Sequence, residues 1–193
     1  MKSFKTIKSI ATPFDKLNVD TDQIIPKQFL KLVQKTGFGQ YLFYDWRFDK
    51  DGKPRSDFIL NDPKYKNSKI LLTRDNFGCG SSREHAAWAL LDYGFTVIIA
   101  SSFADIFYDN CFKNGILPIK VDGEELEMLF KNDSEIEVNL ETQMIKTDRT
   151  TIPFEIEKHR KKTLLEGFDE IAITLQYEDR ISEYEKNQDC IIN

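Results

Sequence analysis

Residues 70–121 have the sequence ILLTRDNFGCGSSREHAAWALLDYGFTVIIASSFADIFYDNCFKNGILPIKV, in which strand-like and helix-like segments alternate. The strand-like segments are short and rich in aliphatic residues, and they cover residues 70–73, 96–100 and 116–121. A predicted helix from about residue 82 ends at Gly94, and a second, capped by Ser101 or Ser102, ends at Gly115. This alternation predicts parallel βαβ crossovers and therefore an α/β fold.

The segments on either side of this unit predict further elements. Before it, we expect a helix over residues 26–35, followed by a loop rich in aromatic residues. After it, we expect a short helix over 124–130, an antiparallel meander of strands over 135–140, 144–147 and 151–156, and helices over 159–166 and 177–187. No repeat or linker divides the chain, so residues 1–193 are expected to form a single domain with a mixed sheet.

Composition excludes several classes of protein. The chain has 193 residues, with 32 acidic and 27 basic side chains. Its pI near 5.2 argues against nucleic-acid binding, which calls for clustered Lys and Arg. Neither a signal peptide nor a membrane span is recognisable, so we expect a cytoplasmic protein without membrane contact. The three cysteines, Cys79, Cys111 and Cys190, lie far apart and predict neither a disulfide framework nor a metal site of the chain's own.

The loop Asn76 to His85, with sequence NFGCGSSREH, joins a predicted strand to a predicted helix. Its two glycines permit positive φ, and the first turn of the helix offers free N–H groups to an anion. Arg83 is mildly unfavourable at the positive end of a helix, which suggests that an anion is expected there, and its guanidinium suits a carboxylate. The same donors would stabilise a deprotonated serine, so a serine of this loop is a candidate base as well as a candidate cap. The alternative is a capping box between Ser81 and Glu84.

Other catalytic patterns fail at this loop. No lysine completes a phosphate-binding P-loop, Arg83 occupies the third glycine position of a dinucleotide fingerprint, and GxSxG is absent. His85 lies one helical turn from the serines, but no acidic residue can be named to orient it. A packing role for His85 is therefore favoured over a Ser/His couple.

A second candidate is the acidic stretch NVDTDQIIP, residues 18–26. Its two carboxylates, Asp20 and Asp22, flank Thr21, and paired acids can bind a metal or orient an arginine. The alternative is an Asx-rich turn that caps a helix beginning near Pro26.

The chain resembles the family of 3-isopropylmalate dehydratase small subunits. The resemblance spans nearly the whole chain, and the stretches that carry it are NVDTDQIIP, TGFG at 36–39, DWRF at 45–48, NFGCGSSREHA at 76–86, SFADIF at 102–107 and Leu117-Pro118. NFGCGSSREHA is the most specific of these and also resembles a loop of the aconitase swivelling domain. Ala87 departs from the family, where proline is common, but proline is not required in a first helical turn.

This resemblance implies a β/β/α three-layer swivelling domain, similar to domain 4 of aconitase, that closes over an active site on a separate large subunit holding a [4Fe-4S] cluster. In a heterodimer or heterotetramer, the enzyme would interconvert 2-isopropylmalate and 3-isopropylmalate through 2-isopropylmaleate in leucine biosynthesis. Ser81 would be the catalytic base, Ser82 would donate a hydrogen bond, and Arg83 would hold a substrate carboxylate. The resemblance assigns Asp20, Thr21 and Asp22 to the substrate site only as residues that shape it.

The chemistry of the implied reaction agrees with a need for a partner. Expulsion of hydroxide requires a Lewis acid, and three scattered cysteines and two histidines give no obvious cluster site, so we expect no cofactor on this chain. Substrate choice is expected in residues 26–48, where several apolar side chains line a pocket or belong to the core: Phe29, Leu30, Leu32, Val33, Phe38, Tyr41, Leu42 and Phe43.

Two alternatives stay open at this stage. One is a small subunit of a related hydro-lyase that acts on citraconate, methylmalate or homoaconitate. A non-catalytic anion-binding or assembly module would use the loop only to cap a helix.

Overall fold

The computed structural model describes residues 1–31 and 36–187, in which seven strands form one sheet in the order β4-β3-β2-β1-β5-β6-β7. The strands are β1 (Ile7–Pro13), β2 (Ile70–Leu72), β3 (Val97–Ala100), β4 (Leu117–Lys120), β5 (Glu135–Asn139), β6 (Met144–Lys146) and β7 (Thr151–Pro153). β1 to β4 are parallel neighbours, whereas β5, β6 and β7 form an antiparallel meander that pairs with β1. The predicted mixed sheet is therefore confirmed.

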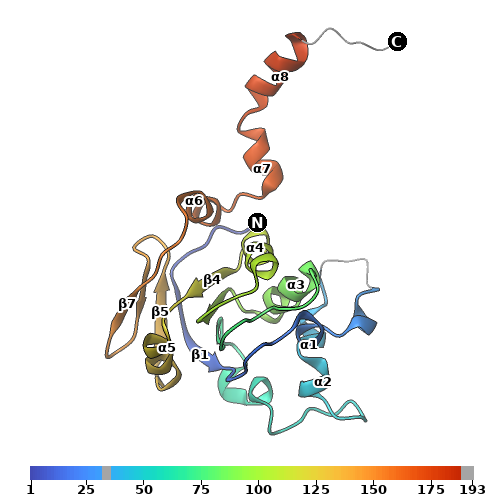
Figure 1. The fold of residues 1–193 in the computed structure, drawn as a ribbon, viewed down its shortest axis with the longest axis vertical. Helices are drawn as coiled ribbons and strands as arrows, with labels where there is room; N and C mark the ends of the chain where they lie inside the picture. The colour runs from blue at the N-terminus through green and yellow to red at the C-terminus, as the bar shows by residue number, and fades with distance from the viewer. Residues whose placement is uncertain (32–35, 188–193) are drawn as a thin grey trace.

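Helices connect these strands and extend beyond them (Figure 1). The α-helices are α1 (Thr21–Ile24), α2 (Tyr44–Arg47), α3 (Glu84–Tyr93), α4 (Asp105–Asn114), α5 (Gly123–Phe130), α6 (Lys158–Glu166), α7 (Glu170–Leu175) and α8 (Glu178–Asn187). Single 3₁₀ turns lie at Lys27–Phe29, Gly39–Tyr41, Ile59–Asn61 and Pro63–Tyr65. No helix in the described ranges is both long and apolar enough to cross a membrane.

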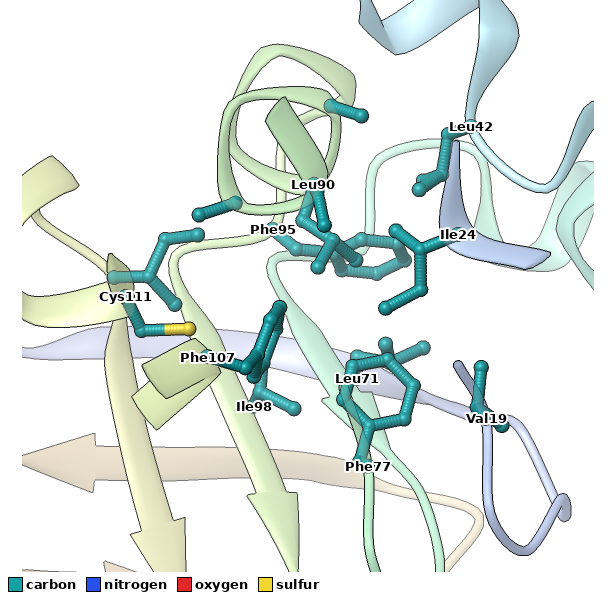
Figure 2. Close-up of a cluster of buried hydrophobic side chains, with 14 of the residues drawn as sticks. Val19, Ile24, Leu42, Leu71, Phe77, Leu90, Phe95, Ile98, Phe107 and Cys111 are labelled. Atoms are coloured by element: carbon teal, nitrogen blue, oxygen red, sulfur yellow. The ribbon is translucent and has the colours of Figure 1, made fainter. Parts of the chain in front are cut away.

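Two hydrophobic clusters divide the molecule into three layers. Side chains on successive positions of a strand point to opposite faces, so Leu71 packs with α3 and α4 while Ile70 and Leu72 point to the other face. Figure 2 shows the first cluster, with Leu71 and Ile98 of the sheet close to Leu90 and Phe107 of the helices.

The second cluster lies on the opposite face of the parallel strands. It includes residues of the parallel strands together with Ile136, Val138 and Ile145 of the meander, which shows that the meander curls over this face. The order meander, parallel strands, helices is the β/β/α three-layer arrangement implied by the resemblance.

The structure corrects several local predictions. Residues 26–35 do not form the expected helix over their described part, where only Lys27–Phe29 is a 3₁₀ turn, and residues 32–35 lie outside the described ranges. α4 begins after Ala104 rather than after Ser101 or Ser102, because the Ser102 hydroxyl instead accepts a hydrogen bond from the Asn76 amide at 2.8 Å.

Strand β1 was not predicted, although it occupies the middle of the sheet. It contains the polar residues Ser9 and Thr12, which are buried in the structure. Polar residues are unusual in a buried central strand, so the sequence pattern did not indicate one. The Ser9 hydroxyl accepts a hydrogen bond from the Lys69 amide at 3.1 Å and donates one to the Ile10 carbonyl at 2.9 Å. These bonds satisfy a group whose burial would otherwise be costly.

The layered core predicts a large effect of truncating the buried Leu71. We expect Leu71→Ala to lower the free energy of unfolding by about 2–5 kcal/mol, because it leaves a cavity between the sheet and α3. Met128→Ala is the control, since Met128 is 52% exposed on α5 and its truncation should change stability by less than about 0.5 kcal/mol. Urea unfolding measures both values. Equal losses for the two variants would contradict the layered core.

Candidate functional site

Three loops that follow neighbouring parallel strands converge at the carboxyl edge of the sheet. The segment after β1 reaches Asp20, the segment after β2 contains residues 76–83, and the segment after β3 leads into α4. Isolated β-bridges join them, between Asp20 and Cys79 and between Phe77 and Phe103. The carboxyl edge of parallel strands is the usual place for a binding site in α/β folds.

Gly78 lets the loop after β2 lie directly on α4. Its φ is +79°, and a Cβ placed there would lie 2.1 Å from Cγ of Phe107. Gly80 also has positive φ, +85°, and faces the Asp20 side chain. Only glycine satisfies both the backbone conformation and the close approach at residue 78.

Ser81 and Ser82 are exposed at the start of α3, and neither caps the helix. The N-cap residue is Arg83, without a capping side chain, so the predicted capping box between Ser81 and Glu84 is wrong. Glu84 instead accepts hydrogen bonds from Asn114 at 2.9 Å and Trp88 at 3.3 Å. The Ser81 hydroxyl forms no hydrogen bond with any described residue. In the first turn of α3 the Ala86 amide donates to the Arg83 carbonyl at 3.2 Å, and no side chain caps the Glu84 and His85 amides.

The acidic stretch lies against these serines through Thr21. The Thr21 hydroxyl is buried and donates to the Ser81 carbonyl at 2.9 Å, and the Thr21 amide donates to the Cys79 carbonyl at 2.9 Å. Residues 60 positions apart in the sequence are thereby held side by side.

The two carboxylates of this stretch have different structural roles. Asp20 caps α1, since it accepts a hydrogen bond from the Gln23 amide at 2.8 Å while the Gln23 side chain accepts one from the Asp20 amide at 2.9 Å. The capping interpretation therefore holds for Asp20, although the helix begins at Thr21 and not near Pro26.

Asp22 instead forms an ion pair with Arg83, which is only 16% exposed, and lies 3.7 Å from Nζ of Lys27. The sequence predicts that the Arg83 guanidinium binds an anion, and in the structure the Asp22 carboxylate of this chain is bound there.

A cavity of about 230 Å³ opens between the serine loop and the start of α4. It is lined by Thr21, Gly78, Gly80, Ser81, Arg83, Ala104, Asp105, Ile106 and Phe107. Of the six residues that the sequence assigned to the site, Ser81, Arg83 and Thr21 line this cavity, whereas Ser82, Asp20 and Asp22 lie beside it.

Sequence reasoning missed Ile106 and Asp105, which contribute an apolar and an acidic side chain to the cavity. Ile106 is 54% exposed although it is a large aliphatic residue. The available signal was its place directly after β3, in the first turn of α4, because the loops that follow parallel strands form the binding edge.

The described residues of 26–48 do not line this cavity. Phe38, Leu42 and Phe43 are fully buried in the first hydrophobic cluster, which confirms the core alternative for these three. Phe29 stacks on Tyr41 with ring centroids 4.0 Å apart, while Leu32 and Val33 lie outside the described residues.

His85 has the packing role that the sequence favoured. Its ring lies 4.5 Å from the Trp88 ring and 5.4 Å from the Phe38 ring, measured between centroids. Burial lowers its pKa, which keeps the imidazole neutral at physiological pH.

The donor set of the described residues does not fit an iron-sulfur cluster. No group of three His, Cys, Asp or Glu side chains in residues 1–31 and 36–187 is arranged to hold a metal ion. Burial raises the pKa of the Cys111 thiol well above its usual value, and burial together with Asp20 raises that of Cys79. Cys190 lies outside the described ranges.

Comparisons with known proteins place this chain in a family. Residues 1–124 match the model of the aconitase C-terminal domain. The 3-isopropylmalate dehydratase small subunit of Brevibacillus brevis is 55% identical over 96% of this chain and 98% of its own length. The protein of the same name from Bacillus cereus is 56% identical over 96% of this chain and 97% of its own length.

A solved structure has the same architecture. The 3-isopropylmalate dehydratase structure from Methanocaldococcus jannaschii matches with a TM-score of 0.69 and 27% identity, over 93% of this chain and 99% of that one.

The close packing of the loop against α4 predicts that a methyl group at residue 78 is poorly tolerated. Gly52 is a matched control, because it also has positive φ, +75°, but a Cβ there would meet nothing nearer than 3.9 Å. We expect Gly78→Ala to lower the free energy of unfolding by about 1–3 kcal/mol more than Gly52→Ala, since only the former adds a steric clash. Urea unfolding of both variants tests this, and equal losses would show that the clash is relieved without cost.

Proposed function

The chain belongs to the family of 3-isopropylmalate dehydratase small subunits, which carry the aconitase C-terminal domain, and we propose that it works as one part of this hydro-lyase. As a single swivelling domain, it would interconvert 2-isopropylmalate and 3-isopropylmalate through 2-isopropylmaleate, in leucine biosynthesis in the cytoplasm. The observation that carries the proposal is a free Ser81 hydroxyl at the positive end of α3, beside a guanidinium, in a cavity of about 230 Å³.

Ser81 is the catalytic base in this proposal. Removal of a weakly acidic C–H proton needs an alkoxide-like oxygen, and such an oxygen is stabilised by nearby donors and by the helix dipole. The Ser81 hydroxyl is not engaged in capping, and its main chain is fixed by Thr21, so its oxygen is available and positioned. Ser82 adds a hydrogen bond to the substrate from the rim of the cavity.

Arg83 binds a substrate carboxylate. The ion pair with Asp22 neutralises the largely buried guanidinium of Arg83, a residue that lines the cavity. When a diacid enters the cavity, one of its carboxylates replaces that of Asp22 on Arg83. The guanidinium therefore exchanges one carboxylate partner for another and is not left unpaired. Asp20 and Thr21 shape this arrangement through the α1 cap and the Ser81 contact.

The Lewis acid that hydroxide departure requires is assigned to a partner chain. No group of three His, Cys, Asp or Glu side chains among the described residues is arranged to hold a metal ion, which supports assigning the [4Fe-4S] cluster to a large subunit. In this proposal the large subunit closes the cavity, in a heterodimer or a heterotetramer.

Ile106 supports an isopropyl-bearing substrate over related diacids. It presents an exposed aliphatic side chain to the same cavity as Arg83, so a substrate whose carboxylate contacts Arg83 can place its branched chain on Ile106. Citraconate and methylmalate carry only a methyl group at the corresponding position and would gain less from this contact.

The first test is the turnover of Ser81→Ala assembled with its large subunit. We expect kcat to fall by about 100-fold or more, because the base is lost, while KM and assembly stay nearly unchanged. Ser82→Ala is the matched neighbour, and its effect should appear mainly in KM. Steady-state kinetics with 2-isopropylmalate gives both constants, and wild-type turnover by Ser81→Ala would refute the role of this residue as base.

The second test concerns substrate choice. We expect Ile106→Ala to raise KM for 2-isopropylmalate about tenfold, because the branched chain loses its apolar contact, and to leave KM for 2-methylmalate nearly unchanged. Assays of the assembled enzyme on both substrates measure the ratio. Equal changes for the two substrates would mean that Ile106 does not contact the branched chain.

A further inference from the structure

Residues 169–187, here called the C-terminal arm, consist of α7 and α8 and extend away from the rest of the molecule (Figure 1). The arm contains most of the large hydrophobic side chains that the described structure exposes. These are Ile171, Ile173, Leu175, Tyr177, Ile181 and Tyr184. An exposed group of this kind marks an interaction surface.

The apolar residues of the arm repeat at helical spacing. Tyr177, Ile181 and Tyr184 are separated by four and three positions, and Ile171 and Leu175 by four, so each set lies on one face of its helix. Such a face is the form in which an amphipathic helix enters an apolar groove of a partner.

The arm also lies in the segment that carries the net charge of the protein. Residues 169–193 hold seven of the 32 acidic and two of the 27 basic side chains, which accounts for the whole formal charge of −5. Residues 1–168 are balanced, with 25 side chains of each sign. A surface that receives this arm is therefore expected to be basic around an apolar centre.

A second copy of the chain does not provide the expected basic surface. Two arms would repel each other, and residues 1–168 offer no net positive charge. The most basic helix, α6, has Arg160 paired with Asp109 and Glu157. Its Lys161 is bonded to the Gln143 side chain and the Glu141 carbonyl.

The root of the arm is firmly attached to the domain. Asp169 caps α7 by accepting a hydrogen bond from the Ala172 amide at 2.8 Å, and it lies 3.9 Å from the Met1 ammonium. Phe168 and Ile173 line a cavity of about 300 Å³ between α4 and α6. The arm therefore starts from a fixed position, although its outer face is uncovered.

This root lies at the opposite end of the sheet from the catalytic cavity. Met1, beside Asp169, precedes the amino end of β1, whereas Ser81 and Arg83 follow the carboxyl end of β2. Docking of the arm therefore does not occupy the cavity.

We propose that the C-terminal arm docks into an apolar groove with a basic rim on the large subunit and supplies affinity for assembly without taking part in the reaction. This inference rests on the proposed function, which supplies the partner. The arm then holds the two chains together at one end of the sheet while the cavity closes on substrate at the other.

The test titrates the full-length chain against a fixed amount of large subunit and follows turnover of 2-isopropylmalate. We expect Leu175→Asp to raise the half-saturating concentration of this chain about tenfold or more, as for a residue central to an interface. At saturation, kcat and KM should equal those of the wild type. Met128→Asp is the matched control, because Met128 is similarly exposed but lies on α5 outside the arm.

Sedimentation equilibrium, on the mixture and on each chain alone, separates the possible failures. An unchanged half-saturating concentration and unchanged association for Leu175→Asp would overturn the proposal. So would a self-association of the wild-type chain that Leu175→Asp abolishes, because the occupant would then be a second copy. A wild-type pair that associates through the arm but does not turn over 2-isopropylmalate would overturn the proposed function and leave the docking role supported.

Discussion

The hydrogen bond from the Thr21 hydroxyl to the Ser81 carbonyl joins the two segments on which the candidate site depends. Both partners sit on loops that follow parallel strands, and the Thr21 side chain is buried, so breaking the bond would leave its hydroxyl without a partner beside the core. It fixes the main chain of Ser81 and brings Asp22 to Arg83. The same bond thus positions the proposed base and the proposed carboxylate clamp of this small subunit.

The Asp22–Arg83 ion pair prearranges the proposed site for a diacid. Asp22 provides Arg83 with the carboxylate that the substrate would later provide, and α3 begins without a capping side chain. Because the Asp22 carboxylate already holds the Arg83 guanidinium in place, that side chain loses little conformational entropy when it binds a substrate carboxylate instead. The site is preorganised in this sense. The chain lacks a donor set for iron in its described residues, which is consistent with a partner that supplies the Lewis acid.

Much of the fold follows from sequence patterns, because aliphatic strands and glycine-terminated helices alternate between residues 70 and 121. The central strand β1 escaped notice, since its buried Ser9 and Thr12 look polar when their burial is unknown. Ser81 and Glu84 have the spacing of a capping box, but the Glu84 carboxylate accepts a hydrogen bond from Asn114 instead. Asn114 is 30 positions away, so no local pattern reveals this contact. Ile106 was missed although it follows a predicted strand, because its place in the cavity also depends on how two loops meet.

The most direct test of this account is a structure of the assembled enzyme with 2-isopropylmalate bound. The account predicts that Arg83 leaves Asp22 to bind a substrate carboxylate, with the Ser81 hydroxyl oxygen about 3–3.5 Å from the carbon that loses its proton. A Ser81 oxygen far from that carbon, with Arg83 still paired to Asp22, would contradict it.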